Sequence, residues 1–351
     1  MVNTNSCSRL QGLDLARFLA FVGMVVVNFK IVMGAEDDGG VLGVLAGSLE
    51  GKAAATFVVL AGVGLGLAAS RSSHSQTVLV TMKRAAFLLA LGLVNSLIFD
   101  ADIIHYYAFY FLFGVLALPF RTRTLVAAIV SLNLAFLVLL VVLDYDVGWN
   151  WGDYSYVGFW TPSGFIRNLF FNGWHPVIPW LAFLLFGILL SRAGLANTTT
   201  QNRLILYGAI TLVFAEAVSE LLSRSLTVID PELAIIATTA PIPPMPLYVV
   251  AGSGAAAAVI GLCLRYAWWF DKVGIIRIVT PAGRQTLTLY IAHILVGMGA
   301  LEALGMLGGQ SLRSSVLAAL VFCGLSIIYA LLWSRTFKRG PIEGAMRRIA
   351  G

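Results

Sequence analysis

The chain has 351 residues, of which 59% are hydrophobic and only 11% are charged, and its mean hydropathy is +0.89. A water-soluble domain carries about 25% charged residues, so this composition excludes an ordinary soluble enzyme and indicates a multi-pass membrane protein. The net charge is +6 and the pI is near 9.3, which suits a nucleic-acid-binding protein only where the basic residues form one surface. The three cysteines, Cys7, Cys263 and Cys323, are scattered and predict neither a disulfide framework nor a metal site.

The apolar segments predict the fold class, because a helix needs about 20 apolar residues to cross the hydrocarbon core of a bilayer. On that scale the sequence predicts an all-α fold, a polytopic helical bundle of about ten transmembrane helices that forms one membrane domain over residues 1–351. The predicted helices lie near residues 13–34, 53–70, 82–99, 104–120, 124–143, 176–191, 204–222, 246–264, 286–306 and 314–333.

The charged residues between these helices alternate in sign, which orients the bundle. With the N-terminus taken as cytoplasmic, the inner segments are basic, with Arg9, Arg71, Lys83, Arg84, Arg121, Arg123, Arg192, Arg203, Arg265, Lys272, Arg277 and Arg284. The outer segments are acidic, with Glu36, Asp37, Asp38, Glu50, Asp100, Asp102, Asp144, Asp146, Asp153, Asp230 and Glu232. Cytoplasmic loops carry an excess of Lys and Arg, so we predict an inner cell membrane location, both termini in the cytoplasm, and a basic cytoplasmic tail over residues 334–351. This distribution explains the high pI without a nucleic-acid partner.

The first predicted helix contains two charged side chains, Asp14 and Arg17, near its cytoplasmic end. Residues three apart share a face of a helix, so one interpretation is an internal ion pair that satisfies both charges. The other is that Arg17 binds an anionic ligand from the cytosol while Asp14 orients the guanidinium. Asn28 lies about 16 Å further along the helix, at 1.5 Å per residue, and so near its outer end.

Three of the four histidines occupy suggestive positions. His105 begins the predicted fourth helix and His175 the sixth, both at the outer face, whereas His74 belongs to an inner loop. Asp102 is three residues before His105, and a carboxylate beside an imidazole fixes its tautomer and suits a general base. Helix capping by Asp102 explains the same spacing. His293 lies near mid-membrane, where either a hydrogen bond from another helix satisfies it or it lines a water-filled cavity.

The segment "FNGWHPVIPW" raises a similar choice. Asn172, His175 and Trp180 together are predicted to face a substrate, although an Asn-Gly turn and a proline at the start of a helix are ordinary features. The glycines of "AGVGLGLAA", at positions 62, 64 and 66, lie inside a predicted membrane helix and favour close helix packing. The aromatic residues of the outer loop 144–175 indicate either an interfacial belt or a platform for a sugar or lipid head group.

Several motifs together resemble the heparan-alpha-glucosaminide N-acetyltransferase family and its bacterial YeiB-like relatives. "RLQGLDLARFLAFVGMVVVN" resembles the opening helix of that family, and "TFVVLAGVGLGLA" resembles its second helix. "DIIHYYAFYFLFG" is similar to its D-I-L-x-x-Y-A segment, and "NGWHPVIPWLAFLLFGILLSR" to its N-G-x-H-P-x-x-P-W segment. "AGRQTLTLYIAH" and the tail "KRGPIEGAMRR" resemble the two closing motifs, so the resemblance runs from residue 9 to about residue 348.

The resemblance implies acetyl transfer across the membrane, from cytosolic acetyl-CoA to an amine or hydroxyl at the outer face. Matched by motif, the binding residues for the donor are Asp14, Arg17 and Arg284. The matched residues elsewhere are Asn28, Asp102, Asn172, His175, Trp180, Tyr290 and Glu343. The family is expected to use a histidine in the outer loop after the first helix, but this chain has none there, and the equivalent position falls near Asp38.

We therefore predict a transmembrane acyltransferase in which His105 or His175, with Asp102, takes the proton from the acceptor. The predicted substrate residues are Asn28, Asp38, Asn172, Trp180, Tyr290 and His293. The predicted partners are membrane lipids, a coenzyme A thioester and a small carbohydrate or glycolipid, with no metal and with a homodimer left open. The alternatives are a transporter of a small anionic or amphipathic solute, for which His293 is the natural site, and a membrane scaffold without turnover.

Overall fold

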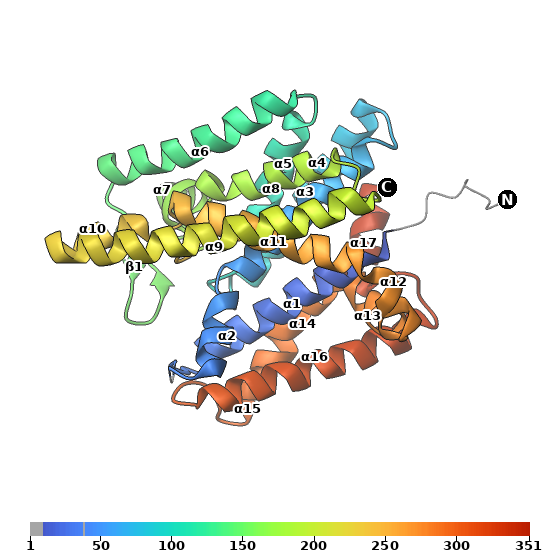
Figure 1. Ribbon diagram of the computed structural model, residues 1–351. Coiled ribbons are helices and arrows are strands. Elements are labelled where there is room, and N and C mark those ends of the chain that lie inside the picture. Colours follow the sequence, from blue (N-terminus) through green and yellow to red (C-terminus); the bar gives the residue numbers. More distant parts are fainter. Residues whose placement is uncertain (1–9, 38) are drawn as a thin grey trace.

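The computed structural model describes residues 10–37 and 39–351 and is built almost wholly from helices (Figure 1). The first half contains α1 (Gln11–Val32), α2 (Val41–Leu49), α3 (Lys52–Ala69), α4 (His74–Asn95), α5 (Ile104–Ala117), α6 (Thr122–Val142), α7 (Pro162–Arg167) and α8 (Val177–Ser191). The second half contains α9 (Thr198–Ile229), α10 (Pro231–Ala234), α11 (Pro246–Arg265), α12 (Ala267–Lys272), α13 (Ile275–Gly283), α14 (Thr286–Ala292), α15 (Gly299–Ala303), α16 (Leu312–Ser334) and α17 (Pro341–Ala350). A small hairpin pairs β1 (Trp149–Asn150) with β2 (Ser155–Tyr156).

The all-α membrane bundle predicted from hydropathy is confirmed, whereas the predicted number of crossings is only partly matched. Within the described ranges, eight helical runs are long and apolar enough to cross a membrane, and a ninth forms where Pro162–Asn172 and Val177–Ser191 count as one span bent by 51°. Each of the ten predicted ranges contains a helix. The exception in length is α5, which has 14 residues. Pro119 follows it and has no N–H with which to continue the helical hydrogen bonds.

Several predicted boundaries also differ from the structure, and α9 spans Thr198–Ile229 where residues 204–222 were predicted. α2 precedes α3 in one apolar run, Val41–Ala69, where only residues 53–70 were predicted. α4 begins at His74, because the Ser73 hydroxyl accepts the N–H of Gln76 and caps the helix there. The predicted tail 334–351 contains a further helix, α17, that packs against α4 and α14.

The helices differ in how much of their surface other helices cover. In the most apolar 18 residues, 61% of α1 and 67% of α11 are buried, against 11% of α6 and 17% of α9. α1 packs against α3, α11, α13 and α16, and α6 and α9 lie along the outside of the bundle (Figure 1). Apolar side chains left uncovered on a membrane helix face lipid, so α6 and α9 form part of the lipid-facing surface.

The predicted close packing at glycines occurs between α3 and α8. A Cβ atom at Gly62 would overlap the Leu184 carbonyl oxygen, and one at Gly66 would overlap the Ser191 hydroxyl. Gly64 points the other way, and its nearest neighbour would be the Arg17 guanidinium at 3.5 Å. The interface therefore needs glycine at positions 62 and 66, but not at position 64.

Gly62→Ala is therefore expected to destabilise the protein by about 1–3 kcal/mol, the usual range for overpacking a close interface. The matched control, Gly64→Ala, adds the same methyl group at ordinary contact distance and is expected to leave stability nearly unchanged. Thermal unfolding of both variants in detergent micelles measures the difference. Equal melting temperatures for the two variants would contradict this assignment.

Candidate functional site

Two cavities open at different depths along α1. The larger, about 840 Å³, is lined by Arg17, Arg71, Arg84, Arg284 and Arg347 and is called the arginine cavity below. The smaller, about 510 Å³, is lined by Asn28, Lys30, Glu36, Glu50 and His175 and is called the His175 cavity below. Because Arg17 lies near the start of α1 and Lys30 near its end, the two cavities approach each other from opposite ends of the bundle.

The predicted pair of Asp14 and Arg17 forms part of the arginine cavity. Asp14 is 1% exposed, its Oδ1 accepts a hydrogen bond from Arg17 at 2.7 Å, and its Oδ2 accepts one from Arg284 at 3.3 Å. Both arginines also line the cavity. Arg17 therefore forms the internal ion pair with Asp14 and also lies where a ligand could contact it, so the two interpretations are compatible. A carboxylate shared by two guanidinium groups fixes their positions and leaves a net positive charge.

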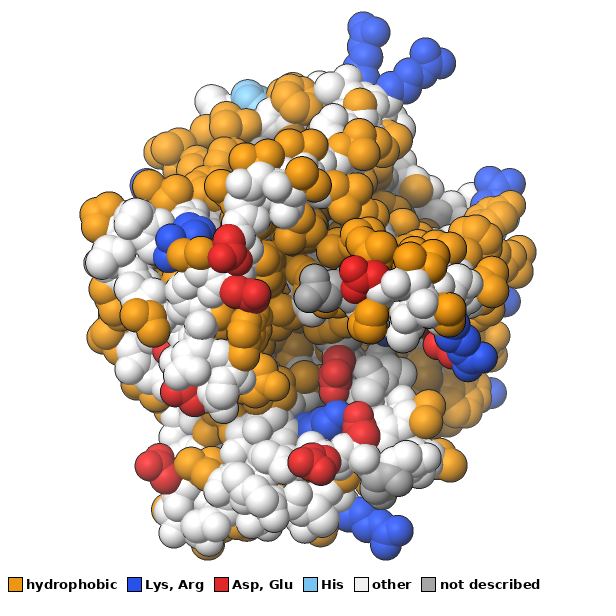
Figure 2. Space-filling view, turned by 90° about the vertical axis from the view of Figure 1, so that its left-hand side faces the viewer, with side chains coloured by type: hydrophobic (Ala, Val, Ile, Leu, Met, Phe, Trp, Pro, Cys, Tyr) orange, Lys and Arg blue, Asp and Glu red, His pale blue; other side chains and the backbone are white. Residues whose placement is uncertain are grey.

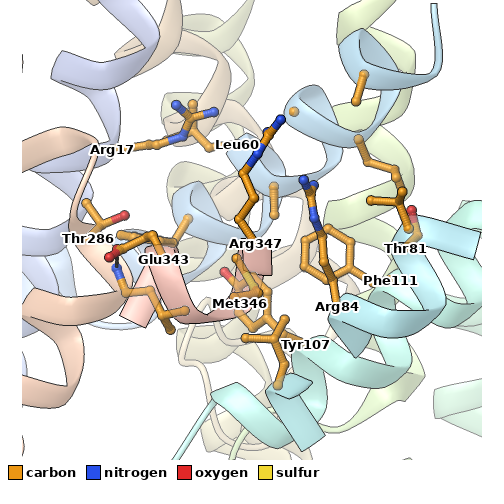
Figure 3. Close-up of a pocket in the computed structure, with 18 of the residues that line it drawn as sticks. Arg17, Leu60, Thr81, Arg84, Tyr107, Phe111, Thr286, Glu343, Met346 and Arg347 are labelled. Carbon is orange, nitrogen blue, oxygen red and sulfur yellow. Dashed lines mark hydrogen bonds between the residues drawn. The ribbon is translucent and has the colours of Figure 1, made fainter. Parts of the chain in front are cut away.

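Three further arginines of this cavity were missed as site residues, because the sequence placed them among the inner-face charges. Arg71 follows α3, Arg84 lies on α4 and Arg347 on α17. Figure 3 shows the side chains of Arg17, Arg84 and Arg347 extending into one region of the cavity. The position of Arg84 inside the predicted apolar range 82–99 was the available signal, since a charge within a membrane helix usually marks a functional site.

The His175 cavity lies toward the end of the bundle where acidic side chains gather around a hollow (Figure 2). Lys30 is buried and forms ion pairs with Asp37 at 2.9 Å and Glu50 at 2.7 Å. Trp180 is fully buried and presents its ring to His175 at 4.6 Å between centroids. Among the described residues, Nδ1 of His175 has no hydrogen-bond partner. The cavity thus combines a neutralised lysine, an aromatic wall and an imidazole.

Asp102 and His105 form a buried cluster beside these cavities. Asp102 Oδ2 accepts both the backbone N–H of His105 at 3.0 Å and its Nδ1–H at 2.9 Å, while Oδ1 accepts the Asn95 amide at 2.7 Å. Capping and imidazole orientation, the two interpretations of the spacing, are therefore both present. His105 Nε2 has no partner among the described residues, and its ring packs on Tyr106 and Phe159. Neither Asp102 nor His105 lines the arginine cavity or the His175 cavity.

Three residues line both cavities and separate them: Met24 on α1, Ile103 before α5 and Tyr290 on α14. We call this set the septum. The Tyr290 hydroxyl oxygen accepts the backbone N–H of Ile103 at 3.4 Å, and Ile103 directly follows Asp102 in the chain. The septum is therefore narrow, and its one polar side chain is held next to the Asp102–His105 cluster.

Asn28 and His293 contact each other across the bundle. Asn28 Nδ2 donates to His293 Nε2 at 2.9 Å, and His293 Nδ1 is bonded to the carbonyl oxygen of Tyr290. Both imidazole nitrogens therefore have partners, the first of the two alternatives considered for this histidine. His293 is fully buried and lines neither cavity, which removes the position that the transporter interpretation relied on. Asn28 faces the His175 cavity.

Asn172 is buried beneath the loop that contains the β1–β2 hairpin. Its amide donates to the carbonyls of Tyr145 at 2.7 Å and Val147 at 2.9 Å, and its Oδ1 accepts the Tyr156 hydroxyl at 2.8 Å. These bonds use the whole side chain to order the loop, and Asn172 lines neither cavity. Asp38 lies outside the described residues.

The loop over residues 144–175 contributes aromatic side chains to the His175 cavity. Trp149 stacks on Trp151 at 4.5 Å and meets Trp174 edge-on, and Tyr154 and Trp174 line the cavity. Asp100 is exposed nearby, where partial burial and the neighbouring Asp153 raise the pKa of its carboxyl group. Part of the aromatic loop therefore belongs to the site as a wall.

These features define the class of protein, a multi-pass helical membrane protein with two cavities that contain charged side chains and are separated by a narrow septum inside the bundle. Residues 9–226 match the family described as heparan-alpha-glucosaminide N-acetyltransferase, catalytic. Residues 182–351 match a family described as a protein of unknown function, DUF418. The first match covers more than half of the chain, so the protein belongs to the heparan-alpha-glucosaminide N-acetyltransferase catalytic family. The second match supports its place among the YeiB-like members. No curated protein matches the sequence.

The site joins the two matched regions. Met24, Ile103 and His175 lie in the first match, whereas Tyr290 and Arg347 lie in the second. Within the described part of the chain, no group of three or more His, Cys, Asp or Glu side chains is arranged to hold a metal ion.

Proposed function

We propose that the protein transfers an acetyl group from acetyl-CoA, bound in the arginine cavity, to an amine or hydroxyl bound in the His175 cavity. The observation that carries this proposal is that the two cavities share the three residues of the septum. A donor and an acceptor that enter from opposite ends can then meet at one point. Holding two reactants together in this way is itself a large part of catalysis.

The arginine cavity suits a coenzyme A thioester in charge and size. A volume of about 840 Å³ is at the upper end of the usual range for small-molecule sites. Guanidinium groups bind phosphate through paired hydrogen bonds, and Arg17 and Arg284 are held for that task by Asp14. From the positive-inside rule we propose that this end faces the cytoplasm, where acetyl-CoA is made, and that the protein lies in the inner membrane.

In the proposed reaction the acceptor nitrogen or oxygen attacks the thioester carbonyl, the carbon–sulfur bond breaks, and coenzyme A leaves with a proton on sulfur. We assign the removal of the acceptor proton to His175, because His175 lines the acceptor cavity and His105 does not. Asp102 and His105 are then assigned a structural role, because their hydrogen bonds fix the backbone on either side of Ile103 in the septum. The Tyr290 hydroxyl, whose oxygen accepts the Ile103 N–H, donates a hydrogen bond to the developing oxyanion and keeps its proton. The proton that His175 takes from the acceptor is the one that ends on the sulfur of coenzyme A.

The acceptor is proposed to be a small carbohydrate or glycolipid. Trp174, Trp180 and Tyr154 provide flat apolar walls, and Asn28, Glu36 and Glu50 provide hydrogen-bonding groups around the same cavity. We propose that membrane lipids contact the exposed apolar faces of α6 and α9, and that the protein can form a homodimer.

The purified protein, incubated with radiolabelled acetyl-CoA and a set of amino sugars and glycolipids, is expected to transfer the label. In liposomes, the label from acetyl-CoA supplied on one side should appear on an acceptor enclosed on the other. Solute flux through the liposomes without turnover of acetyl-CoA would instead identify a transporter and overturn this proposal.

A further inference from the structure

The C-terminal helix α17 is attached to the start of α14 by a carboxylate. Glu343 Oε1 accepts the backbone N–H groups of Leu287 at 2.8 Å and Thr288 at 3.0 Å, and Oε2 accepts the Thr288 hydroxyl at 2.5 Å. The first N–H groups of a helix lack partners within the helix, and a negative charge is favoured beside them. Glu343 therefore caps a helix that lies more than fifty residues earlier in the sequence.

The attachment is reciprocal. The Thr288 hydroxyl oxygen accepts the Ile342 N–H at 3.1 Å, so α14 also satisfies the first turn of α17. Gly340 precedes this turn, and a Cβ atom there would overlap the Glu343 carboxylate and lie 2.7 Å from the Thr288 hydroxyl. Trp333 on α16 donates to the Arg339 carbonyl at 2.7 Å and fixes the connection. The whole tail is thus built to hold α17 in one position.

This position brings Arg347 to the arginine cavity. Arg347 lies one helical turn after Glu343 and extends toward Arg17 and Arg84 (Figure 3). Arg84 Nε is buried and has no partner among the described residues. Glu343, the acidic residue that lines this cavity, directs both carboxylate oxygens to hydrogen bonds with α14. Like charges that converge on a cavity in this way are stabilised by an anionic ligand.

We propose that α17 is part of the donor site: Arg347 and Arg84 together bind a phosphate group, and Glu343 is the positioning residue that holds Arg347 there. This inference rests on the proposed function and deepens it, because it assigns a phosphate-binding role to the tail.

The direct test measures binding of coenzyme A, and of inorganic pyrophosphate as a minimal probe, to the full-length protein in detergent. A hydrogen bond to a charged group contributes enough that Arg347→Ala and Arg84→Ala should each weaken coenzyme A binding by about 10–100-fold. Arg348→Ala is the matched control, since it removes the same charge from the next position of α17 and does not line the cavity. Its affinity for coenzyme A is expected to stay within about twofold of the original.

The positioning role of Glu343 has its own readouts. Glu343→Ala should speed hydrogen–deuterium exchange in residues 341–350 and raise the KM for acetyl-CoA with a much smaller effect on kcat. Glu343→Gln keeps an acceptor oxygen for the α14 N–H groups, so its effect on both quantities should be smaller.

The inference is overturned by equal losses in Arg347→Ala and Arg348→Ala, by unchanged binding in Arg347→Ala, or by a wild-type protein that binds neither probe. Coenzyme A binding that depends on Arg347 but not on Arg348, in a protein that transfers no acetyl group, would support this inference and contradict the proposed function. The two failures are therefore distinguishable.

Discussion

His175→Ala is expected to lower acetyl transfer by about 10²–10⁴-fold, the usual contribution of a general base. The physical reason is its location: His175 is the histidine that lines the proposed acceptor cavity, and its ring is held against Trp180. The affinity for coenzyme A should remain within about twofold of that of the unaltered protein, because His175 does not line the arginine cavity. Transfer assays with labelled acetyl-CoA, with donor binding measured separately, check both expectations.

His74→Ala serves as the control, since His74 is exposed at the start of α4 and lines neither cavity. Its transfer rate should equal that of the unaltered protein. A large loss in His105→Ala together with a normal rate in His175→Ala would assign the base to His105 instead. Normal rates in both variants would show that neither histidine is the base.

Asp102→Ala is expected to destabilise the fold by roughly 3 kcal/mol or more. The carboxylate accepts the Asn95 amide, the His105 backbone N–H and the His105 imidazole N–H in a fully buried position. Each buried donor left without an acceptor costs about 1–3 kcal/mol, and a methyl group replaces none of the three bonds. The melting temperature in detergent micelles should fall by roughly 5 °C or more on this scale.

Asp100→Ala is the matched control for this substitution, two residues earlier in the same loop. Asp100 is exposed, and a surface substitution of this kind usually changes stability by less than about 0.5 kcal/mol. A fall in melting temperature as large as that of Asp102→Ala would contradict the distinction between the two carboxylates. Asp102→Asn retains one acceptor oxygen, so its melting temperature should lie between those of Asp102→Ala and the unaltered protein.

Local spacing predicted the pairs that lie within one helical turn. Asp14 with Arg17, and Asp102 with His105, are each three residues apart. Helix geometry brings the first pair to one face, whereas Asp102 lies just before α5 and accepts the backbone N–H of His105 in its first turn. The structure adds the third member of each cluster, Arg284 and Asn95, from another helix. Sequence reasoning left the base as His105 or His175, and only His105 had an adjacent carboxylate. The structure adds that His175 lines a cavity and that His105 lines neither of the two, which sequence spacing does not predict because access to a cavity depends on how the helices pack.

The contacts between segments that are distant in the sequence could not be predicted from the sequence. Asn28 and His293 are 265 residues apart, and no local pattern relates them. α2 and α17 have 9 and 10 residues, too few for a hydropathy scale set by the thickness of a bilayer. Arg347 was therefore predicted as part of a tail and not as part of a cavity.

By itself the sequence determined the membrane class, the all-α fold and the approximate place of each long helix. The reason is that a chain can cross the hydrocarbon core of a bilayer only where its backbone polar groups are bonded internally, as they are in a long apolar helix. Its motifs also determined the family. Only the tertiary structure decided which polar side chains meet. It joined Met24, Ile103 and Tyr290 into a septum between two cavities, because that arrangement depends on how α1, α14 and the segment before α5 pack together.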